Sequence, residues 1–407
     1  MDRYLLLFRN PRALVALVAG VLFVIALMGF GTGLNLEEWR NLALILGGMI
    51  ALPLAAWRSG IAAKQVALTE AGHNTDRYQK AVTMLGDVRL SVREAGIFAL
   101  TELAENNFEK YHVTVMKLLC SFIKDRSSEQ KQEQSKERKR QMELEEQRVQ
   151  RAELEQQNLP AFGRHIPQRR PTVALQDIIA PDCQTALTGL SALRKIATVN
   201  NCALVNIELD LNNTNLSGAS LIGADLRGAF FEKANLQGVL LMGGDLEGAF
   251  LNGADLKGAF LDIARLVGVD LSGANLEGAH LLKANLKRAN LLGAQLSGAI
   301  LAGTNLTEAD LKGVDLTGAH LTNSDLSGAN LTSASLAGAV LIHSDLSGTN
   351  LTSASLASAV LVDADLTDAD LTNATVSTEQ LRTAKFVDEK WMEHFSKLEN
   401  GNDPERI

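Results

Sequence analysis

The most regular feature of the chain is a leucine at every fifth position across its C-terminal half. From Leu211 to Leu371 this spacing continues through 33 positions, with Phe231 as the exception. Two residues before each position stands alanine in 23 of the 33 cases, and nearly all of the other residues there are small. A period of five matches neither an α-helix, at about 3.6 residues, nor a β-strand, at about 2 residues. The pattern therefore predicts a chain that makes a short straight run, turns, and repeats the unit.

The same spacing predicts which side chains lie inside. The leucine and the small residue point inward, because each run is too short for two large inward groups. Glycine is common two residues after the leucine, where it supplies the positive φ of a tight turn. Four runs per coil, with coils about 4.8 Å apart, give about eight coils and a length of about 40 Å. We therefore predict a β-solenoid over residues 204–376.

Residues 20 apart stack on one face if four repeats make a coil. One outward column is polar or charged throughout, a second is polar, and a third opens with Phe230 and Phe250 before turning polar. The fourth face is rich in apolar residues at two outward positions. Ser220 begins the column at the first position, and Ile222 begins the column two residues later. We call the rest of this face the apolar wall, which consists of Leu240, Met242, Phe260, His280, Leu282, Ile300, His320, Val340, Ile342, Val360 and Val362.

An extended apolar strip on a protein surface marks an interaction site or a covered one. We predict that the apolar wall is an interaction surface for a protein partner or a second copy of the chain. Two alternatives are that helices of the same chain cover it, and that it has drifted without function.

The repeat unit resembles the A(D/N)LXX motif of the pentapeptide-repeat family, as in ADL at 224–226 and ANL at 274–276. The resemblance covers Leu211 to about Val376. It implies a right-handed quadrilateral β-helix. Residues 377–407 contain VSTEQLRTAKF (376–386), which resembles the family's terminal capping helix, with Ser377 or Thr378 as the N-cap residue.

Two apolar runs near the N-terminus predict a transmembrane helical hairpin. Residues 13–30 carry no charge, and 18 helical residues span about 27 Å, close to the hydrocarbon thickness of a bilayer. Residues 42–57 form a second span with tryptophans at its ends and Pro53 as a point where it kinks, and residues 31–41 form the loop between the spans. A cleaved signal peptide is the alternative for the first run.

The charges around these runs predict their orientation. Residues 1–12 carry three arginines, and Arg58 and Lys64 follow the second run. The positive-inside rule then places both termini in the cytoplasm, with residues 1–12 as a cytoplasmic N-terminus. We expect a multi-pass protein of the bacterial cytoplasmic membrane that contacts the bilayer through residues 13–57.

Between the membrane spans and the repeats, the sequence predicts three segments. Residues 58–125 have helical apolar spacing, and residues 75–86 and 112–125 resemble the helical segment of membrane-anchored bacterial members of the family. Residues 126–170 are rich in both charge signs and predict a charged helix or a linker. Residues 171–203 predict a helical lead-in and N-terminal cap, with helices at 172–179 and 184–198.

Charge, cysteine spacing and histidine spacing limit the kinds of ligand and site that the sequence predicts. The net charge of −8 argues against general binding of nucleic acid or anionic lipid. The three cysteines lie far apart, which disfavours a disulfide framework or a zinc site. His280 and His320 would lie about 10 Å apart, too far to share a metal ion. We predict no catalytic residues, no cofactor, no metal and no small-molecule substrate.

These patterns predict a non-enzymatic scaffold that presents a rigid β-helix to a partner in the cytoplasm. The alternative is a DNA-mimic regulator of a type II topoisomerase, a role that the resemblance implies for some members of the family. It is favoured by residues 314–376, which hold seven acidic side chains and no lysine or arginine. An enzyme is the third alternative.

Overall fold

The computed structural model describes Gly20 and residues 36–157, 179–199 and 208–399. The chain divides into two compact units, residues 1–79 and 80–407. The first unit contains most of helix α3 (Leu36–Leu85), which has 50 residues and is about 75 Å long. The span predicted at residues 13–30 lies outside the described residues, apart from Gly20.

The other membrane predictions fall partly on α3. The second span, at residues 42–57, lies within this helix, which continues past Pro53 and Trp57 to Leu85. The predicted loop at 31–41 is wrong in its second half, because residues 36–41 already belong to α3. Of the helices in the described ranges, none is both long and apolar enough to cross a membrane. The predicted transmembrane hairpin is therefore not confirmed.

The second unit begins with a helical module. It consists of the last residues of α3 together with α4 (Leu90–Asn106), the first part of α5 (Phe108–Gln157), and α6 (Pro181–Val199). Its core is made by buried residues from each helix, which include Leu85, Leu100, Leu103, Leu119, Ile123 and Leu187. Gly96 allows α3 and α4 to approach closely, because an added Cβ would lie 2.8 Å from the Cβ of Met84.

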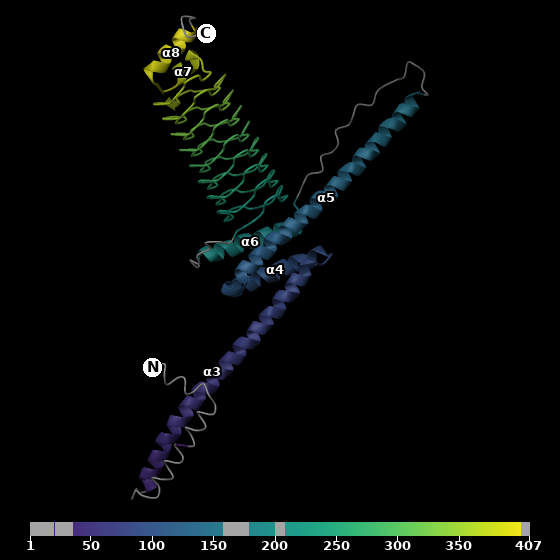
Figure 1. The fold of residues 1–407 in the computed structure, drawn as a ribbon, viewed down its shortest axis with the longest axis vertical. Helices are drawn as coiled ribbons and strands as arrows, with labels where there is room; N and C mark the ends of the chain where they lie inside the picture. The colour runs from purple at the N-terminus through teal and green to yellow at the C-terminus, as the bar shows by residue number, and fades with distance from the viewer. Residues whose placement is uncertain (1–19, 21–35, 158–178, 200–207, 400–407) are drawn as a thin grey trace. The chain divides into compact units, whose positions relative to one another are not determined.

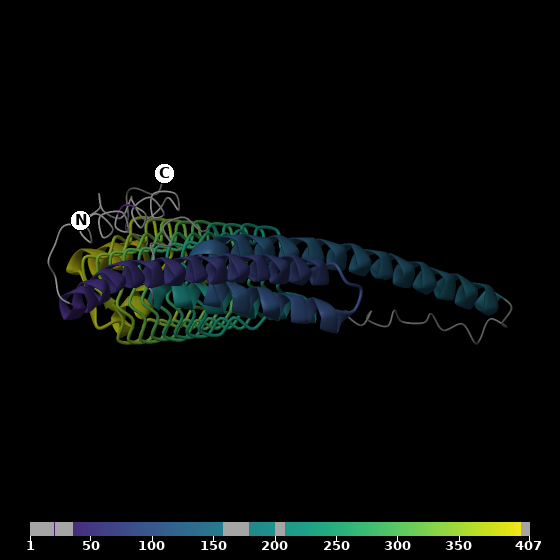
Figure 2. The same ribbon diagram turned by 90° about the horizontal axis from the view of Figure 1, so that it is seen from below.

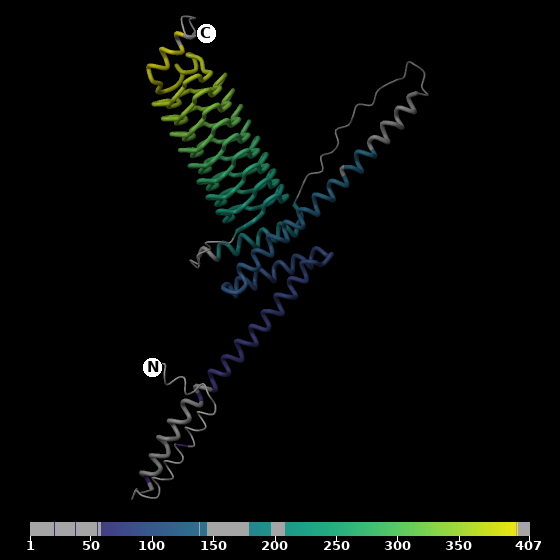
Figure 3. Tube along the Cα trace, in the orientation of Figure 1, coloured from purple at the N-terminus to yellow at the C-terminus, as the bar shows by residue number. Residues whose placement is uncertain are grey.

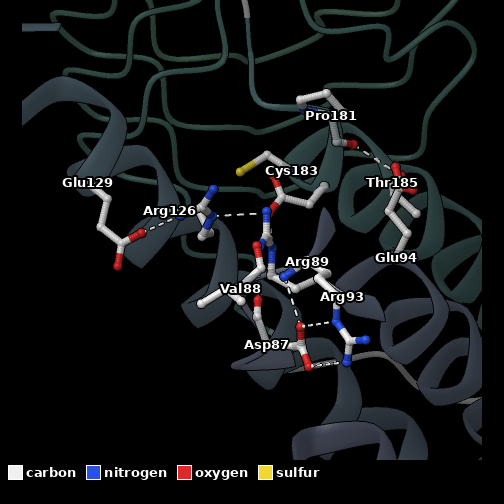
Figure 4. A network of polar contacts seen from close by, with 11 residues as sticks. Asp87, Val88, Arg89, Arg93, Glu94, Arg126, Glu129, Pro181, Cys183 and Thr185 are labelled. Carbon is white, nitrogen blue, oxygen red and sulfur yellow. Dashed lines mark hydrogen bonds and ion pairs between the residues drawn. The ribbon is translucent and has the colours of Figure 1, made fainter. Parts of the chain in front are cut away.

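A buried carboxylate joins three helices of this module. The side chain of Asp182, at the start of α6, has no exposed surface. It accepts hydrogen bonds from Arg93 Nε of α4 at 2.7 Å and from Arg126 Nε of α5 at 3.0 Å (Figure 4). Removal of one partner from a buried ion pair leaves an uncompensated charge, which makes this network a strong constraint on how the helices pack.

The charged segment predicted as a helix or a linker is helical over most of its length. Helix α5 continues without a break from the apolar core of the module to Gln157 (Figure 1). The remainder of that segment, residues 158–170, lies outside the described residues. The predicted lead-in helix at 172–179 falls mostly outside them, and the one at 184–198 corresponds to α6.

The repeats form a four-sided solenoid, seen as a stack of similar coils in Figures 1 and 2. Each coil bonds to the next at a spacing of 20 residues, as in the bridge between Ile300 and His320. There the N–H of Leu301 donates to His320 at 2.7 Å, and the N–H of His320 donates to Ala299 at 2.9 Å. Every residue of the ladder from Leu211 to Leu371 is buried. The predicted solenoid with four repeats per coil is confirmed.

The corners are β-turns of one kind. At one of them the N–H of Ala299 donates to the carbonyl of Leu296 at 3.0 Å, and Gly298 between them has a φ of +64°. This left-handed conformation carries no steric penalty for glycine, which explains why glycine recurs at this position of the repeat.

Side chains of the helical module cover the first coil. The amide of Gln184 on α6 pairs with the backbone of Ser220, donating to its carbonyl and accepting from its N–H, each at 2.8 Å. Ser127 of α5 accepts from the N–H of Asn215. These side chains replace the hydrogen bonds that a preceding coil would make, so they close an edge that could otherwise pair with another chain.

The C-terminal segment closes the last coil. Helix α7 (Thr378–Thr383) is capped by Ser377, one of the two N-cap residues predicted from the sequence, in a capping box with Gln380. The Gln380 amide also donates to the carbonyls of Leu356 and Ala359 at 2.7 and 2.8 Å. Strand β2 (Phe386–Val387) pairs with β1 (Asp365–Leu366), and α8 (Glu389–Glu399) follows. Both ends of the solenoid are therefore covered by residues of the same chain.

The stability of the helical module should depend on pH through His112 of α5. This side chain is buried, neither ring nitrogen has a hydrogen-bond partner among the described residues, and burial lowers its pKa below the usual value of 6.5. The unfolded chain therefore binds a proton more readily than the folded one. The free energy of unfolding should consequently fall as the pH drops from about 7.5 to about 5.5.

This slope can be measured by urea unfolding followed by circular dichroism. His112→Phe should reduce the slope, because the phenyl ring cannot titrate. His320→Gln, on the exposed surface of the solenoid, is the matched control and should leave the slope unchanged. An identical slope in wild type and His112→Phe would contradict the prediction.

Candidate interaction surface

The residues of the apolar wall lie together on one side of the solenoid. Consecutive bridges join Ser220, Leu240, Phe260, His280, Ile300, His320, Val340 and Val360 in a single column. The positions two residues later in each coil continue the wall as a neighbouring column. Figure 3 shows the coils in register along this length. The stacking that the sequence predicts is therefore present.

Neighbouring coils also bring the side chains of the wall into contact. The rings of Phe260 and His280 lie 4.7 Å apart with an angle of 32° between their planes. Most members are half-buried by this stacking, whereas His320 is exposed and Leu282, Val360 and Val362 are exposed at 42%, 38% and 39%. The result is a mainly apolar strip along the solenoid, interrupted by His280 and His320 and, in the neighbouring column, by Asp262 and Thr322.

Helices of the second unit meet the solenoid at its ends. The hydrogen bonds and ion pairs from α5 and α6 reach the first coil, for example at Asp210, Asn215 and Ser220. Those from α7 and its flanks reach the last coils, for example at Leu356 and Ala364. The alternative in which the chain's own helices cover the apolar wall therefore does not apply to α4–α8 within the described residues.

One long edge of the apolar wall adjoins the face that carries the column from Asp225 to Asp365. The charged side chains differ between the two ends of this edge. In the middle coils this edge carries Arg265 and Lys283. Arg265 pairs with Glu247 at 2.8 Å, whereas Lys283 forms no ion pair in the part of the chain that the structure describes. In the last coils the next face begins with Asp325, Asp345 and Asp365, which are stacked through consecutive bridges.

The first of these carboxylates is held in its charged form. Partial burial raises the pKa of Asp325, but hydrogen bonds from the hydroxyl and N–H of Ser327 outweigh burial and leave the pKa below its usual value. For the three stacked carboxylates, no lysine or arginine lies within ion-pair distance among the described residues. The C-terminal half of this edge is therefore a strip of negative charge.

An exposed residue beside the wall was not predicted from the sequence. Ile263 has a φ of +60°, and its side chain is 69% exposed. A β-branched residue in the left-handed region is strained, because its Cβ substituents crowd the backbone. The signal was present in the repeat, since glycine or a polar residue occupies the equivalent corner of the other coils. Strain of this kind points to a constraint other than stability.

The histidines of the wall do not form a metal site in this structure. His280 and His320 are separated by the coil that holds Ile300. Over the described ranges, no group of three or more histidine, cysteine, aspartate or glutamate side chains could hold a metal ion.

The described cysteines are poor nucleophiles. Cys120 and Cys183 are buried and free, and burial raises the pKa of both thiols to about 12. Cys202 lies outside the described residues. Because the thiolate is the reactive form, neither buried thiol would react readily with a thiol reagent.

A surface hollow of about 410 Å³ lies next to the last coils and contains a histidine and a serine. His343 Nδ1 is 3.6 Å from Asp363 Oδ2. However, the hydroxyl of Ser344 is buried and donates to the carbonyl of Leu341 at 2.6 Å, so it does not face His343 as a nucleophile would. The hollow therefore lacks the arrangement of a hydrolase site.

A family model described as pentapeptide repeats matches the solenoid in eight copies. The matched segments are residues 207–238, 234–262, 264–303, 299–336 and 334–373. The comparison with curated proteins found no match.

Several solved structures are similar to parts of the chain. HetL, a pentapeptide repeat protein involved in heterocyst differentiation regulation from the cyanobacterium Nostoc sp. strain PCC 7120, is 38% identical. The match covers 42% of this chain and 79% of HetL, with a TM-score of 0.33. Rfr23, from the cyanobacterium Cyanothece 51142, is 35% identical over 25% of this chain and 65% of its own, with a TM-score of 0.21.

QnrB1, a plasmid-mediated fluoroquinolone resistance protein, is similar at lower identity. It is 20% identical over 47% of this chain and 93% of its own, with a TM-score of 0.34.

The strain at Ile263 should be measurable. Ile263→Asn should raise the free energy of unfolding by about 1 kcal/mol, because asparagine tolerates the left-handed region better than a β-branched residue. Ile222→Asn is the matched control, since Ile222 is also exposed and has no positive φ. Equal effects of the two substitutions in chemical unfolding would show that Ile263 is not strained.

Proposed function

This chain belongs to the pentapeptide-repeat family through residues 207–373, and on that premise we propose that it is a non-enzymatic scaffold that binds a protein through the apolar wall. The observation that carries the proposal is the continuous column from Leu240 to Val360, which is apolar except at His280 and His320. A soluble surface rarely keeps an apolar strip of this length unless it binds something. The right-handed quadrilateral β-helix of this family supplies the rigid support.

The covered ends of the solenoid support a lateral binding mode. A solenoid with open edges could extend by pairing with another chain end to end. Here Gln184 and Ser127 occupy the first edge, and Gln380 and β2 occupy the last. Binding is then left to the sides, of which the apolar wall is the least polar.

We also propose that the chain is anchored in the cytoplasmic membrane of a bacterium. The support is the apolar character of residues 13–30 and 42–57 and the arginines that flank them. Both termini, and with them the β-helix, would face the cytoplasm. Anchoring would hold the scaffold beside membrane proteins and raise its effective concentration toward them.

Charges placed in the wall should abolish partner binding without unfolding the β-helix. Phe260→Asp with Ile300→Asp puts two carboxylates in the centre of the wall, and the expected loss of affinity is at least about tenfold, or ~1.4 kcal/mol. The matched control is Asn290→Asp with Asn330→Asp on the opposite face. The measurement is cross-linking in membranes by the full-length chain, followed by mass spectrometry.

The proposal requires one partner to be lost with the wall variant and retained with the control. If both variants capture the same proteins as wild type, the wall is not the binding surface. Recovery of the intact chain in the supernatant after membranes are pelleted would contradict the proposed anchor.

A second candidate function is mimicry of DNA toward a type II topoisomerase. The observation that favours it is the acidic segment at residues 314–376, which lacks lysine and arginine. The charge density of the whole solenoid is lower than that of DNA. Residues 209–376 hold 18 acidic and 8 basic side chains, a net charge of −10. Spread over about 40 Å, this is one charge per ~4 Å, against one per ~1.7 Å in duplex DNA.

A supercoiling assay separates the two candidate functions. The scaffold proposal predicts that micromolar full-length protein leaves the activity of DNA gyrase unchanged. Inhibition that disappears when Asp325, Asp345 and Asp365 are changed together to asparagine would favour mimicry instead. The same change at Asp255, Asp270 and Asp310, on other faces, is the control for a general effect of lost charge.

A further inference from the structure

The size of the side chains changes along the apolar wall. Its N-terminal half presents long or aromatic residues, namely Leu240, Met242, Phe260 and Leu282. Its C-terminal half presents branched residues, namely Val340, Ile342, Val360 and Val362, of which three are the shorter valine. Because all of them stand on one regular backbone, the first half projects further from the solenoid than the second. A flat partner would fit only one half of this surface closely.

The charge beside the wall changes in the same direction. Arg265 and Lys283 lie along the N-terminal and middle coils, and the carboxylates of Asp325, Asp345 and Asp365 lie along the last coils. Asp245, which is also near the N-terminal end, lies 3.8 Å from Arg227 and 3.7 Å from Arg265 and is thereby neutralised. Among the described residues of this edge, Arg265 is also paired with Glu247 at 2.8 Å and Lys283 forms no ion pair, whereas the last coils carry the stacked carboxylates.

We infer that two copies of this chain pair wall to wall in an antiparallel arrangement, with the twofold axis at Ile300. The inference rests on the proposed function and names the partner of the same surface. With the axis at Ile300, Leu240 faces Val360 of the second copy, and Phe260 faces its Val340. Large side chains thus meet smaller ones toward both ends of the contact, His280 faces His320 and Ile300 faces itself near the axis, and the twofold axis repeats each pairing.

The same arrangement pairs the charges. The twofold axis runs across the wall, perpendicular to the solenoid axis. Rotation about it reverses the direction of the solenoid and leaves each long edge of the wall beside the same edge of the second copy. Lys283 then lies beside Asp325 of the second copy, and Arg265 lies beside its Asp345. Each pair occurs twice, so four ion pairs surround the apolar contact and fix its direction.

A parallel arrangement lacks both features. Equivalent coils would meet, so Phe260 would face Phe260 and Val360 would face Val360. The C-terminal halves would also meet, where residues 314–376 contain no lysine or arginine and Lys385 of the same chain lines a hollow with Asp345 and Asp365. A parallel twofold pair places each edge beside the opposite edge of the second copy, so the stacked carboxylates lose Lys283 as a partner, which favours the antiparallel pair.

Ile263 gains a role in this arrangement. Its coil faces the coil of Ile342 and His343 in the second copy. The exposed isoleucine then extends the apolar contact beyond the wall itself, which accounts for a strained residue at a corner where glycine would be more stable.

The area of the wall sets the expected affinity. Seven coils at about 4.8 Å and a side about 10 Å wide give an apolar strip of roughly 350 Å² per copy. A standard stable interface buries about 800 Å² per partner, so the dimer should be weak and reversible. Confinement of both copies to one membrane would raise their effective concentration and favour pairing.

The test uses the full-length chain in mild detergent, with its mass measured by sedimentation over a range of concentrations. Wild type should pass from monomer to dimer. Lys283→Asp should weaken dimerisation by about tenfold, because two ion pairs are lost and replaced by repulsion. The double variant Lys283→Asp with Asp325→Lys should restore it. Failure of the double variant to recover dimerisation would overturn the antiparallel register.

A cross-linking arm tests the position of the axis. Ile300→Cys in a Cys202→Ser background should cross-link to itself through a bis-maleimide of about 10 Å, the spacing of two packed β-faces. Asn290→Cys on the opposite face is the control. The buried Cys120 and Cys183 should contribute little to either reaction. Equal cross-linking at Ile300→Cys and Asn290→Cys would show that the wall does not pair with itself.

Failure of this inference can be told apart from failure of the proposed function. A monomer at all concentrations, with no cross-link at Ile300→Cys, overturns the dimer. If the same chain still loses a specific membrane partner on Phe260→Asp with Ile300→Asp, the wall remains an interaction surface. If the wall variants change neither mass nor partner capture, both proposals fall.

Discussion

Hydrogen bonds between successive coils, repeated at 20 residues, are the constraint from which the rest of this structure follows. Each coil must close in four equal sides for its N–H and carbonyl groups to meet those of the next coil. Closure at that size leaves room inside for one leucine and one small residue per side. The same register places every outward residue directly above the one 20 positions earlier. When the same kind of side chain recurs at one outward position of successive coils, these side chains therefore form a continuous surface along the solenoid.

That constraint also creates two open edges, and the helices around the solenoid occupy them. Gln184 and Gln380 use side-chain amides to make the hydrogen bonds that a further coil would make. The helical module that supplies Gln184 is itself held by the buried carboxylate of Asp182 between Arg93 and Arg126. Stability of the module and protection of the first edge are thus linked. The lateral faces remain as the place for recognition, and only one of them is apolar along most of its length.

Pairing of two such faces would give the protein a use for features that stability alone does not explain. The difference in side-chain size between the two halves, Lys283 and the stacked carboxylates on one edge, and the strained Ile263 all lie on or beside the apolar wall. Each of these features either lowers the stability of the isolated β-helix slightly or leaves that stability unchanged. Together they form a surface that is complementary to itself in one direction only.

The amino-acid sequence by itself determined the repeat, the inward leucine ladder, the four-sided coil and the membership of the apolar wall. It could do so because a solenoid makes sequence separation equivalent to position in space, so that Leu240 and Phe260 are neighbours by register alone. The N-cap at Ser377 was also predictable, because a capping box is a local arrangement of four residues. Only the tertiary structure decided that α5 continues to Gln157, that Asp182 joins three helices, and that Gln184 covers the first coil. Those contacts join residues about 35 to 90 positions apart without any repeat to relate them, and their geometry depends on how the helices pack.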